Sequence, residues 1–191
     1  MRKYGWSPEG NRMSEKKYKI KIGQRNLKTA MAATLCALIY LLFGRNPTFA
    51  CIGTVFGMGT DINDSIKNGG NRFFGTMIGG FLGMLLFRLY ICFMPDGQFR
   101  ALMLLFVFVG VVLLILVSQM FRWVGAVQPG SVVLCIILFN TPVDQYISYS
   151  INRMIDTGIG VAIALLINWL LPRERVNRWK TALLKKLKKE T

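Results

Sequence analysis

The sequence contains no histidine and only nine acidic residues among its 191 residues. Without histidine, the chain cannot build a His-dependent catalytic triad, a His-ligated zinc site or a histidine proton shuttle, which excludes most common hydrolases and metalloenzymes. Charged residues make up 17% of the chain, whereas a soluble domain has about a quarter. We therefore expect a protein that is not an enzyme and that uses no metal or cofactor.

Closely spaced cysteine pairs are also missing. The four cysteines stand far apart, and each lies within an apolar segment. We interpret them as small hydrophobic residues rather than as metal ligands or disulfide partners. They are Cys36, Cys51, Cys92 and Cys135.

Basic residues are abundant, but they are concentrated at the two ends of the chain. Of the 24 lysines and arginines, 17 lie in residues 1–28 or 173–189, and the middle is apolar. Positive segments that flank membrane spans are expected from topology, so they predict contact with anionic membrane lipids rather than with nucleic acid. We predict a basic cytoplasmic tail at residues 1–26 and a basic amphipathic helix at residues 172–191.

Four apolar stretches approach the roughly 20 residues with which a helix crosses a bilayer, and two further stretches are weaker. The weaker ones, 48–60 and 124–140, are short or interrupted, and 13 helical residues reach only about 20 Å of a roughly 30 Å hydrocarbon core. We predict an all-α integral membrane protein with six transmembrane helices in residues 27–171, the second and fifth being short, broken or partly re-entrant. The stronger stretches are 27–43, 73–94, 101–118 and 153–171.

The basic residues also predict the orientation of the chain. With six crossings and a cytoplasmic N-terminus, twenty basic residues fall on the inner side and three on the outer side, namely Arg45, Arg100 and Arg153. This bias is typical of a bacterial inner-membrane protein with both termini in the cytoplasm. A four-span arrangement, with both weak stretches outside the membrane, places the termini on the same side and stays open as an alternative.

The chain contains an internal repeat. Sliding the sequence by 81 residues aligns residues 60–85 with 141–166 at eight identical positions, and the pattern N-R-x-x-[GD]-T-x-I-G begins at Asn71 and again at Asn152. Each copy, 27–94 and 101–171, contains three predicted crossings, and an odd number inserts the second copy in the opposite sense. The prediction is a 3+3 inverted repeat, in which paired short or Pro-interrupted helices mark the substrate region of many secondary transporters.

Charged residues inside apolar spans are costly and usually functional. Arg72 and Arg153 begin the matched spans, on opposite faces of the membrane in the six-crossing arrangement. Asp156 is one turn from Arg153, so we expect these two side chains to pair. In one reading the arginines attract an anion at the two entrances of one path, and in the other they only anchor the helices at the interface.

Prolines also stand at matching positions of the two copies. Helices that begin at Pro47 and Pro129 expose free N–H groups and a positive dipole end, which suit a carboxylate. In the alternative reading these prolines merely begin helices. The polar residues before them, Asn46 and Gln128, complete this pair of candidate substrate-binding segments.

Small residues recur every four positions in the third and sixth spans. Small residues at this spacing let helices approach closely in lipid, so we predict that these two spans form the central pair. In the first copy they are Gly75, Gly79 and Gly83, and the matched positions of the second copy include Gly160 and Ala164.

Four sequence patterns resemble those of a known family. They are K-T-A-x-A-A from Lys28, N-P-x-F-A from Asn46, N-R-x-x-G-T-x-I-G-G from Asn71 and N-R-x-x-D-T-x-I-G-x-x-x-A-x-x-I-N-W from Asn152. Over residues 28–171 the chain resembles the membrane block of the fusaric acid resistance and aromatic acid exporter proteins and, more distantly, the plant aluminium-activated malate transporters.

The resemblance implies a six-helix module, used as a dimer or duplicated, that exports aromatic or other carboxylates past basic residues. Preference for aromatic substrates is implied by the resemblance alone, although Phe49, Phe56, Phe73 and Phe74 are able to stack on a ring. The positions that match the repeated family motif are Arg72 with Thr76, and Arg153 with Asp156 and Thr157.

The sequence therefore favours a membrane protein that exports a small organic anion such as an aromatic carboxylate. A homodimer is predicted, because one six-helix block offers limited enclosure. Two alternatives stay open: a passive anion channel that uses the same arginines, and a non-transporting scaffold whose basic tails recruit lipid or protein. Asp156 is the only acidic residue within a predicted span, so proton coupling has a single candidate.

Overall fold

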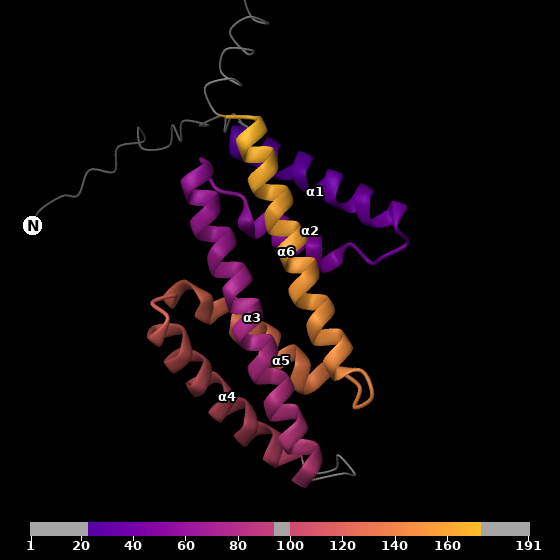
Figure 1. Ribbon diagram of the computed structural model, residues 1–191, viewed down its shortest axis with the longest axis vertical. Coiled ribbons are helices and arrows are strands. Elements are labelled where there is room, and N and C mark those ends of the chain that lie inside the picture. The colour runs from indigo at the N-terminus through magenta and orange to yellow at the C-terminus, as the bar shows by residue number, and fades with distance from the viewer. Residues whose placement is uncertain (1–22, 94–99, 173–191) are drawn as a thin grey trace, which may run out of the picture.

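The described part of the protein is built from helices (Figure 1). The computed structural model describes residues 23–93 and 100–172, so nearly all of the predicted N-terminal tail and the predicted C-terminal amphipathic helix lie outside the described residues. The helices are α1 (Gln24–Leu42), α2 (Thr48–Gly57), α3 (Ile62–Phe93), α4 (Arg100–Met120), the 3-10 turn η1 (Val124–Ala126), α5 (Val127–Asn140) and α6 (Tyr146–Leu170).

Three helices of the described residues are long and apolar enough to cross a membrane: Ile62–Phe93, Ala101–Met120 and Tyr146–Leu170. Residues 27–43, the fourth strong stretch of the sequence, lie in α1, which has 19 residues but is not apolar enough to be among these three helices. The physical reason is that the helix starts upstream of the apolar stretch and includes Arg25 and Lys28 in its first two turns.

Two of the long helices, α3 and α6, begin earlier than their apolar stretches predict. α3 begins at Ile62, about three turns before residue 73, because the Asp61 carboxylate accepts a hydrogen bond from the backbone N–H of Asp64 at 2.8 Å and so caps the helix. With 32 residues, α3 is about 48 Å long, well beyond the hydrocarbon core. A helix of this length is either tilted in the bilayer or extends out of it.

The short helices pack on long helices from the other half of the chain. α2 has 10 residues and packs most extensively on α6, whereas α5 has 14 residues and packs most extensively on α3. The Thr54 hydroxyl of α2 donates to the carbonyl of Gly160 in α6 at 2.9 Å. Each half of the chain therefore completes its packing with the help of the other (Figure 1).

The four-residue spacing of small side chains leads to a packing partner other than the predicted one. A Cβ at Gly79 would overlap with the backbone of Gly130 in α5, and a Cβ at Gly160 would overlap with the carbonyl of Ala50 in α2. α3 and α6 do pack against each other, but through other glycines. Gly75, Gly79 and Gly83 thus face the η1–α5 segment, while Gly160 and Ala164 face α2.

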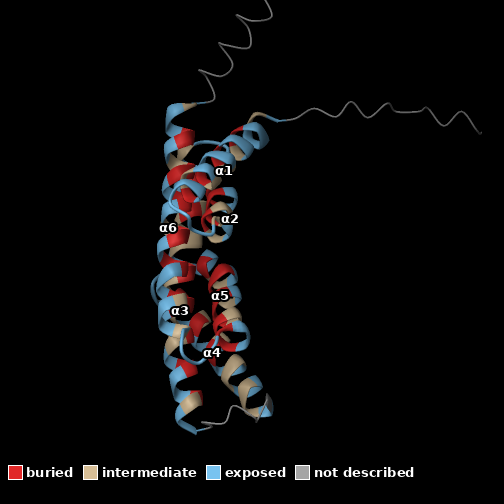
Figure 2. Cartoon of the chain, turned by 90° about the vertical axis from the view of Figure 1, so that its right-hand side faces the viewer, coloured by how far each residue is buried: buried red, intermediate tan, exposed pale blue. Residues whose placement is uncertain are grey.

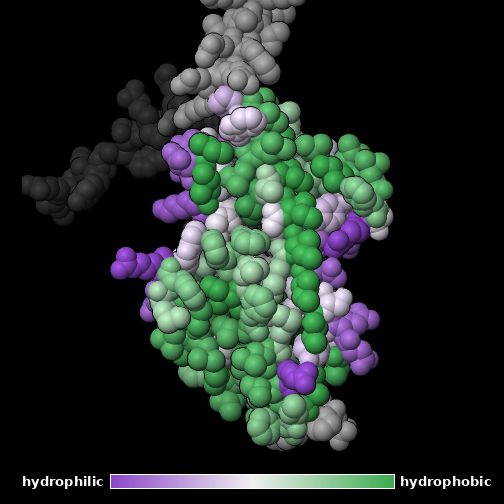
Figure 3. Space-filling model, viewed as in Figure 1, coloured by the Kyte–Doolittle hydropathy of each residue, from purple (hydrophilic) through white to green (hydrophobic). Residues whose placement is uncertain are grey.

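Large hydrophobic side chains cover the outside of the helices as well as the core. Phe43, Phe93 and Phe108 are all about two-thirds exposed or more. Buried residues lie along the helix faces that meet inside the molecule (Figure 2). In the space-filling view, hydrophilic residues gather toward two opposite edges and hydrophobic residues cover most of the face between them (Figure 3). This distribution is that of a protein that crosses the membrane several times.

A buried polar cluster joins the start of α1 to the start of α3 and the end of α6. The Lys28 ammonium donates to Asn168 Oδ1 at 3.0 Å. The Asn168 amide donates in turn to the hydroxyl of Ser65 at 2.8 Å and to the carbonyl of Asp61 at 2.6 Å. Lys28 is only 4% exposed, and hydrogen bonding is what makes burial of such a group tolerable. Lys28 begins the first of the four family-like patterns and Asn168 lies near the end of the last, so the two ends of the matched region contact each other.

Candidate anion-binding region

Arg72 lies at a cavity of about 350 Å³ between α2, α3 and the η1–α5 segment. The sequence motif and the second proline segment meet here, because Gln128 and Pro129 line the same cavity. The cavity is completed by Phe56, Asn68, Asn71, Gly125 and Val132. Of the predicted substrate-binding residues, Arg72, Gln128 and Pro129 are therefore brought together.

The guanidinium of Arg72 has unused binding capacity. It lies over the ring of Phe56, 5.3 Å from the ring centre, and its buried Nε atom has no hydrogen-bond partner within the described residues. α5 starts beside the cavity but continues directly from η1, so the Val127 N–H donates to the Val124 carbonyl, and Pro129 has no N–H. The arginine donor, rather than the helix start, therefore favours an anion at this place.

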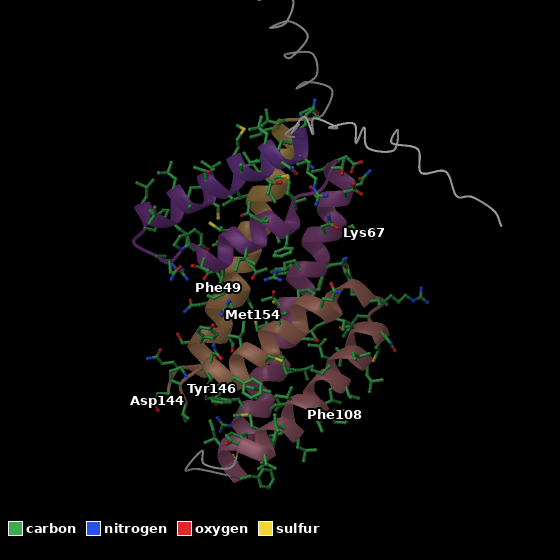
Figure 4. All side chains as sticks on the ribbon, turned by 180° about the vertical axis from the view of Figure 1, so that it is seen from behind. Phe49, Lys67, Phe108, Asp144, Tyr146 and Met154 are labelled. Atoms are coloured by element: carbon green, nitrogen blue, oxygen red, sulfur yellow. The ribbon has the colours of Figure 1, made fainter. Side chains whose placement is uncertain are left out.

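Arg153 is the matched arginine of the second copy and is 6% exposed. Its guanidinium donates to the hydroxyl of Tyr149 and lies over the ring of Phe49. Tyr149 is four residues before Arg153, so both side chains emerge from the same face of α6. Phe49 of α2 and Met154 of α6, the residue after Arg153, both lie toward the middle of the molecule (Figure 4). The Nε atom of Arg153 is buried and has no hydrogen-bond partner in the described part of the chain.

The two arginines lie near each other beside α2. Phe49 and Phe56 are seven residues apart, which is two helical turns or about 10 Å along one face of α2, and each ring contacts one of the guanidinium groups. Arg72 and Arg153 are also close enough for their charges to interact. The prediction of two separate entrances on opposite faces was therefore wrong in geometry, because α3 and α6 cross close to both motifs and bring the arginines into one region.

Asp156 pairs with a residue other than the predicted Arg153. Its carboxylate accepts a hydrogen bond from the Tyr40 hydroxyl at 2.8 Å and forms an ion pair with Arg45 at 3.2 Å. Arg45 also donates to Asn152 Oδ1 at 3.2 Å. The loop between α1 and α2 carries Arg45 to the face of α6 that presents both acceptors, while Arg153 turns toward Phe49 and Tyr149 instead.

The other predicted residues of the site take part in local structure. The Thr76 hydroxyl donates to the carbonyl of Arg72 at 2.9 Å, and Thr157 is buried with its backbone against Gly53. Asn46 accepts hydrogen bonds from the Thr48 N–H and hydroxyl. Pro47 is the residue before α2, and the N–H of Thr48, the first residue of this helix, is bound by the Asn46 side chain.

Several polar residues of this region were not singled out from the sequence. Arg45 was counted only as an outer charge, and its partner Asp156 is 111 residues away, a separation that no local pattern reveals. Tyr40 was missed for the same reason. Tyr149 was detectable, since its spacing of four residues before Arg153 places a hydroxyl on the arginine's helix face.

The chemistry available here is that of anion binding. Two arginines with buried, unused Nε donors lie beside aromatic rings, and an arginine presents several donors to a carboxylate while keeping its charge at physiological pH. Among the described residues, no group of three Cys, Asp or Glu side chains is arranged to hold a metal ion.

Comparison with known families leads to the same chemistry. The family described as aromatic acid exporter family member 1 matches residues 20–171 of the chain. No curated protein and no solved structure matches it. The family match covers all of the described helices and both copies of the arginine motif, and it indicates membrane transport of organic acids rather than catalysis. The chain is a multi-pass membrane protein that belongs to the aromatic acid exporter family.

Proposed function

We propose that the protein exports organic anions such as aromatic carboxylates across the bacterial inner membrane, and that the carboxylate binds between Arg72 and Arg153. The observation that carries this proposal is the pairing of each arginine with a phenylalanine of α2, of which the Arg72–Phe56 pair lines a cavity of about 350 Å³. A guanidinium binds a carboxylate strongly, and the adjacent ring offers a face for an aromatic substrate. In this proposal the anion passes from one arginine to the other along α2.

In the proposed 3+3 inverted repeat, the region between Arg72 and Arg153 lies where the two halves of the chain meet. Repeats 27–94 and 101–171 exchange their short helices, since α2 packs on α6 and α5 packs on α3. This exchange supports a two-fold relation between the halves, with the arginine pair near its centre. Six crossings, two of them by short helices, then form the membrane domain at residues 27–171, and we propose that it works as a homodimer surrounded by membrane lipids.

The topology is tested by single cysteines in a cysteine-free background. We expect a cysteine at Gln145 or Gly97 to react with an impermeant maleimide from outside the cell, and one at Lys67 or Arg122 to react only after permeabilisation. Lys67 and Asp144, the neighbour of Gln145, lie toward opposite edges of the molecule (Figure 4). Reaction of Gln145 only after permeabilisation would contradict six crossings with cytoplasmic termini.

The transport activity is tested with the full chain in liposomes. We expect a radiolabelled benzoate to cross the bilayer faster through liposomes that contain the protein than through empty ones, and unlabelled benzoate to compete with it. Flux that is unchanged by a pH gradient would favour the passive channel, because Asp156 would then couple no proton. The absence of protein-dependent flux would favour the scaffold and contradict the proposal.

A further inference from the structure

A second cavity, which shares no residue with the cavity at Arg72, lies between the end of α1 and α6. It has a volume of about 330 Å³, and its walls are Ile39, Tyr40, Phe43, Arg45 and Ile159. Three of these side chains are apolar, and one is a cation. This size is at the lower end of the range for small-molecule pockets. Such a lining fits a ligand with one negative group and a compact apolar body.

Arg45 is held in place at this cavity but keeps free donors. Within the described residues its hydrogen bonds to Asn152 and Asp156 both use Nη2. Its side chain is 46% exposed, whereas its partner Asp156 is 9% exposed. Nε and Nη1 therefore remain for an incoming carboxylate, and the guanidinium is oriented in advance by acceptors on α6.

The charges around the cavity favour an anion although Arg45 is already paired. Asp156 is close enough to interact electrostatically with Arg153 as well as with Arg45. Two positive charges and one negative charge leave this cluster with a net charge of +1. The Asp156 carboxylate, bound by the Arg45 guanidinium and the Tyr40 hydroxyl, occupies the kind of position that a ligand carboxylate would take.

We propose that Arg45 is the anion-binding residue of a second site, which takes a carboxylate whose apolar body lies against Phe43 and Ile159. Phe43 is 78% exposed and Ile159 is 37% exposed, so the site opens toward the surroundings of the helices. Asp156 and Tyr40 act as positioning residues, and Asp156 competes with the ligand for the guanidinium. The site deepens the proposed export function, since Arg45 binds Asn152 and Asp156, which flank Arg153 on α6, and therefore lies at the level of the proposed anion path.

Photolabelling tests this site in the full chain, reconstituted in nanodiscs of zwitterionic lipid. The probe is 4-benzoylbenzoate, an aromatic carboxylate that forms covalent adducts on illumination, and the adducts are located by peptide mass spectrometry. We expect adducts at Ile39 or Phe43 that excess benzoate removes. Arg45→Gln should lower them at least tenfold, and Arg45→Lys should restore part of them. Arg88→Gln, at an exposed arginine of α3 outside both cavities, is the matched control and should leave them unchanged.

The variant Asp156→Asn gives a result of opposite sign. Because the competing carboxylate is removed, benzoate should bind more tightly, and the benzoate concentration that halves the labelling should fall several-fold. An unchanged or higher concentration would count against the proposal. Equal labelling in Arg45→Gln, or equal labelling by uncharged benzophenone, would show that the probe merely partitions into an apolar surface. Loss of labelling when anionic phosphatidylglycerol is added, without competition by benzoate, would assign the cavity to a lipid headgroup. Labelling that persists in a protein without benzoate flux would overturn the export function and leave this site standing.

Discussion

Gly79→Ala should lower the stability of the protein by about 3 kcal/mol or more. The new methyl group would overlap with the carbonyl and the Cα of Gly130, which are backbone atoms, so α3 and α5 have to move apart. Overpacking of this kind costs about 1–3 kcal/mol, and more when no side chain can rotate away. We expect a large drop in the thermal unfolding temperature in detergent and little correctly folded protein on size exclusion.

The neighbouring residue provides the control. A methyl group at Gly80 meets the Cε end of Met154, a flexible side chain that can adopt another rotamer. Gly80→Ala should therefore change stability by less than about 1 kcal/mol, since alanine also favours the helix over glycine. We expect the same contrast for a second pair on α6. Gly160→Ala should lower stability strongly, whereas Gly158→Ala, whose methyl group would lie 3.1 Å from a ring carbon of Phe73, should lower it only slightly. Equal unfolding temperatures for Gly79→Ala and Gly80→Ala would rule out backbone contact between α3 and α5.

The double variant Arg72→Gln, Arg153→Gln should lose nearly all protein-dependent flux of a labelled carboxylate. A hydrogen bond to a charged partner contributes about 1.5–3 kcal/mol, so each lost arginine should lower the apparent affinity by about tenfold to a hundredfold. Lysine at either position keeps the charge but loses the fork geometry, and should restore flux only in part. Flux is measured in liposomes that contain equal amounts of folded protein.

Arg153→Gln also removes the contacts to Phe49 and Tyr149, so its folding has to be measured separately from its transport. Arg88→Gln removes an exposed arginine from the same helix as Arg72 and should transport like the parent. If the double variant folds and transports normally, the two arginines serve only as anchors and the anion path lies elsewhere.

The sequence carries strong local signals for the helices. The lengths of the apolar stretches and the interrupting Pro129 predict short second and fifth helices, and the structure has 10 and 14 residues there. The motif spacing predicts that Arg72 and Arg153 play related parts. The early start of α3 was missed because residues 62–72 are polar, and an apolar window cannot register a helix that extends beyond the hydrocarbon.

The partners of the polar side chains were beyond sequence reasoning. Periodicity reports which residues share a helix face, but it says nothing about which other helix that face meets. The glycines of α3 therefore predict close packing but not α5 as the partner. In the same way, the local spacing suggested Arg153 for Asp156, whereas the tertiary fold supplies Arg45 from a loop more than one hundred residues earlier.

The packing of α2 on α6 has a consequence for the order in which the protein is assembled. The hydrogen bond from Thr54 to Gly160 cannot form until Gly160 has been synthesised, 106 residues later. This delay is about 5–20 s at common translation rates. Ten helical residues are too few to span a bilayer, so the nascent α2 depends on its packing against α1 and α3 during this interval. The fifth helix faces no such delay, because α3 has already left the ribosome. The α1–α2 pair is therefore the part of the chain that is exposed longest to proteases and insertion errors. A chain that stops before α6 leaves α2 without its main packing partner.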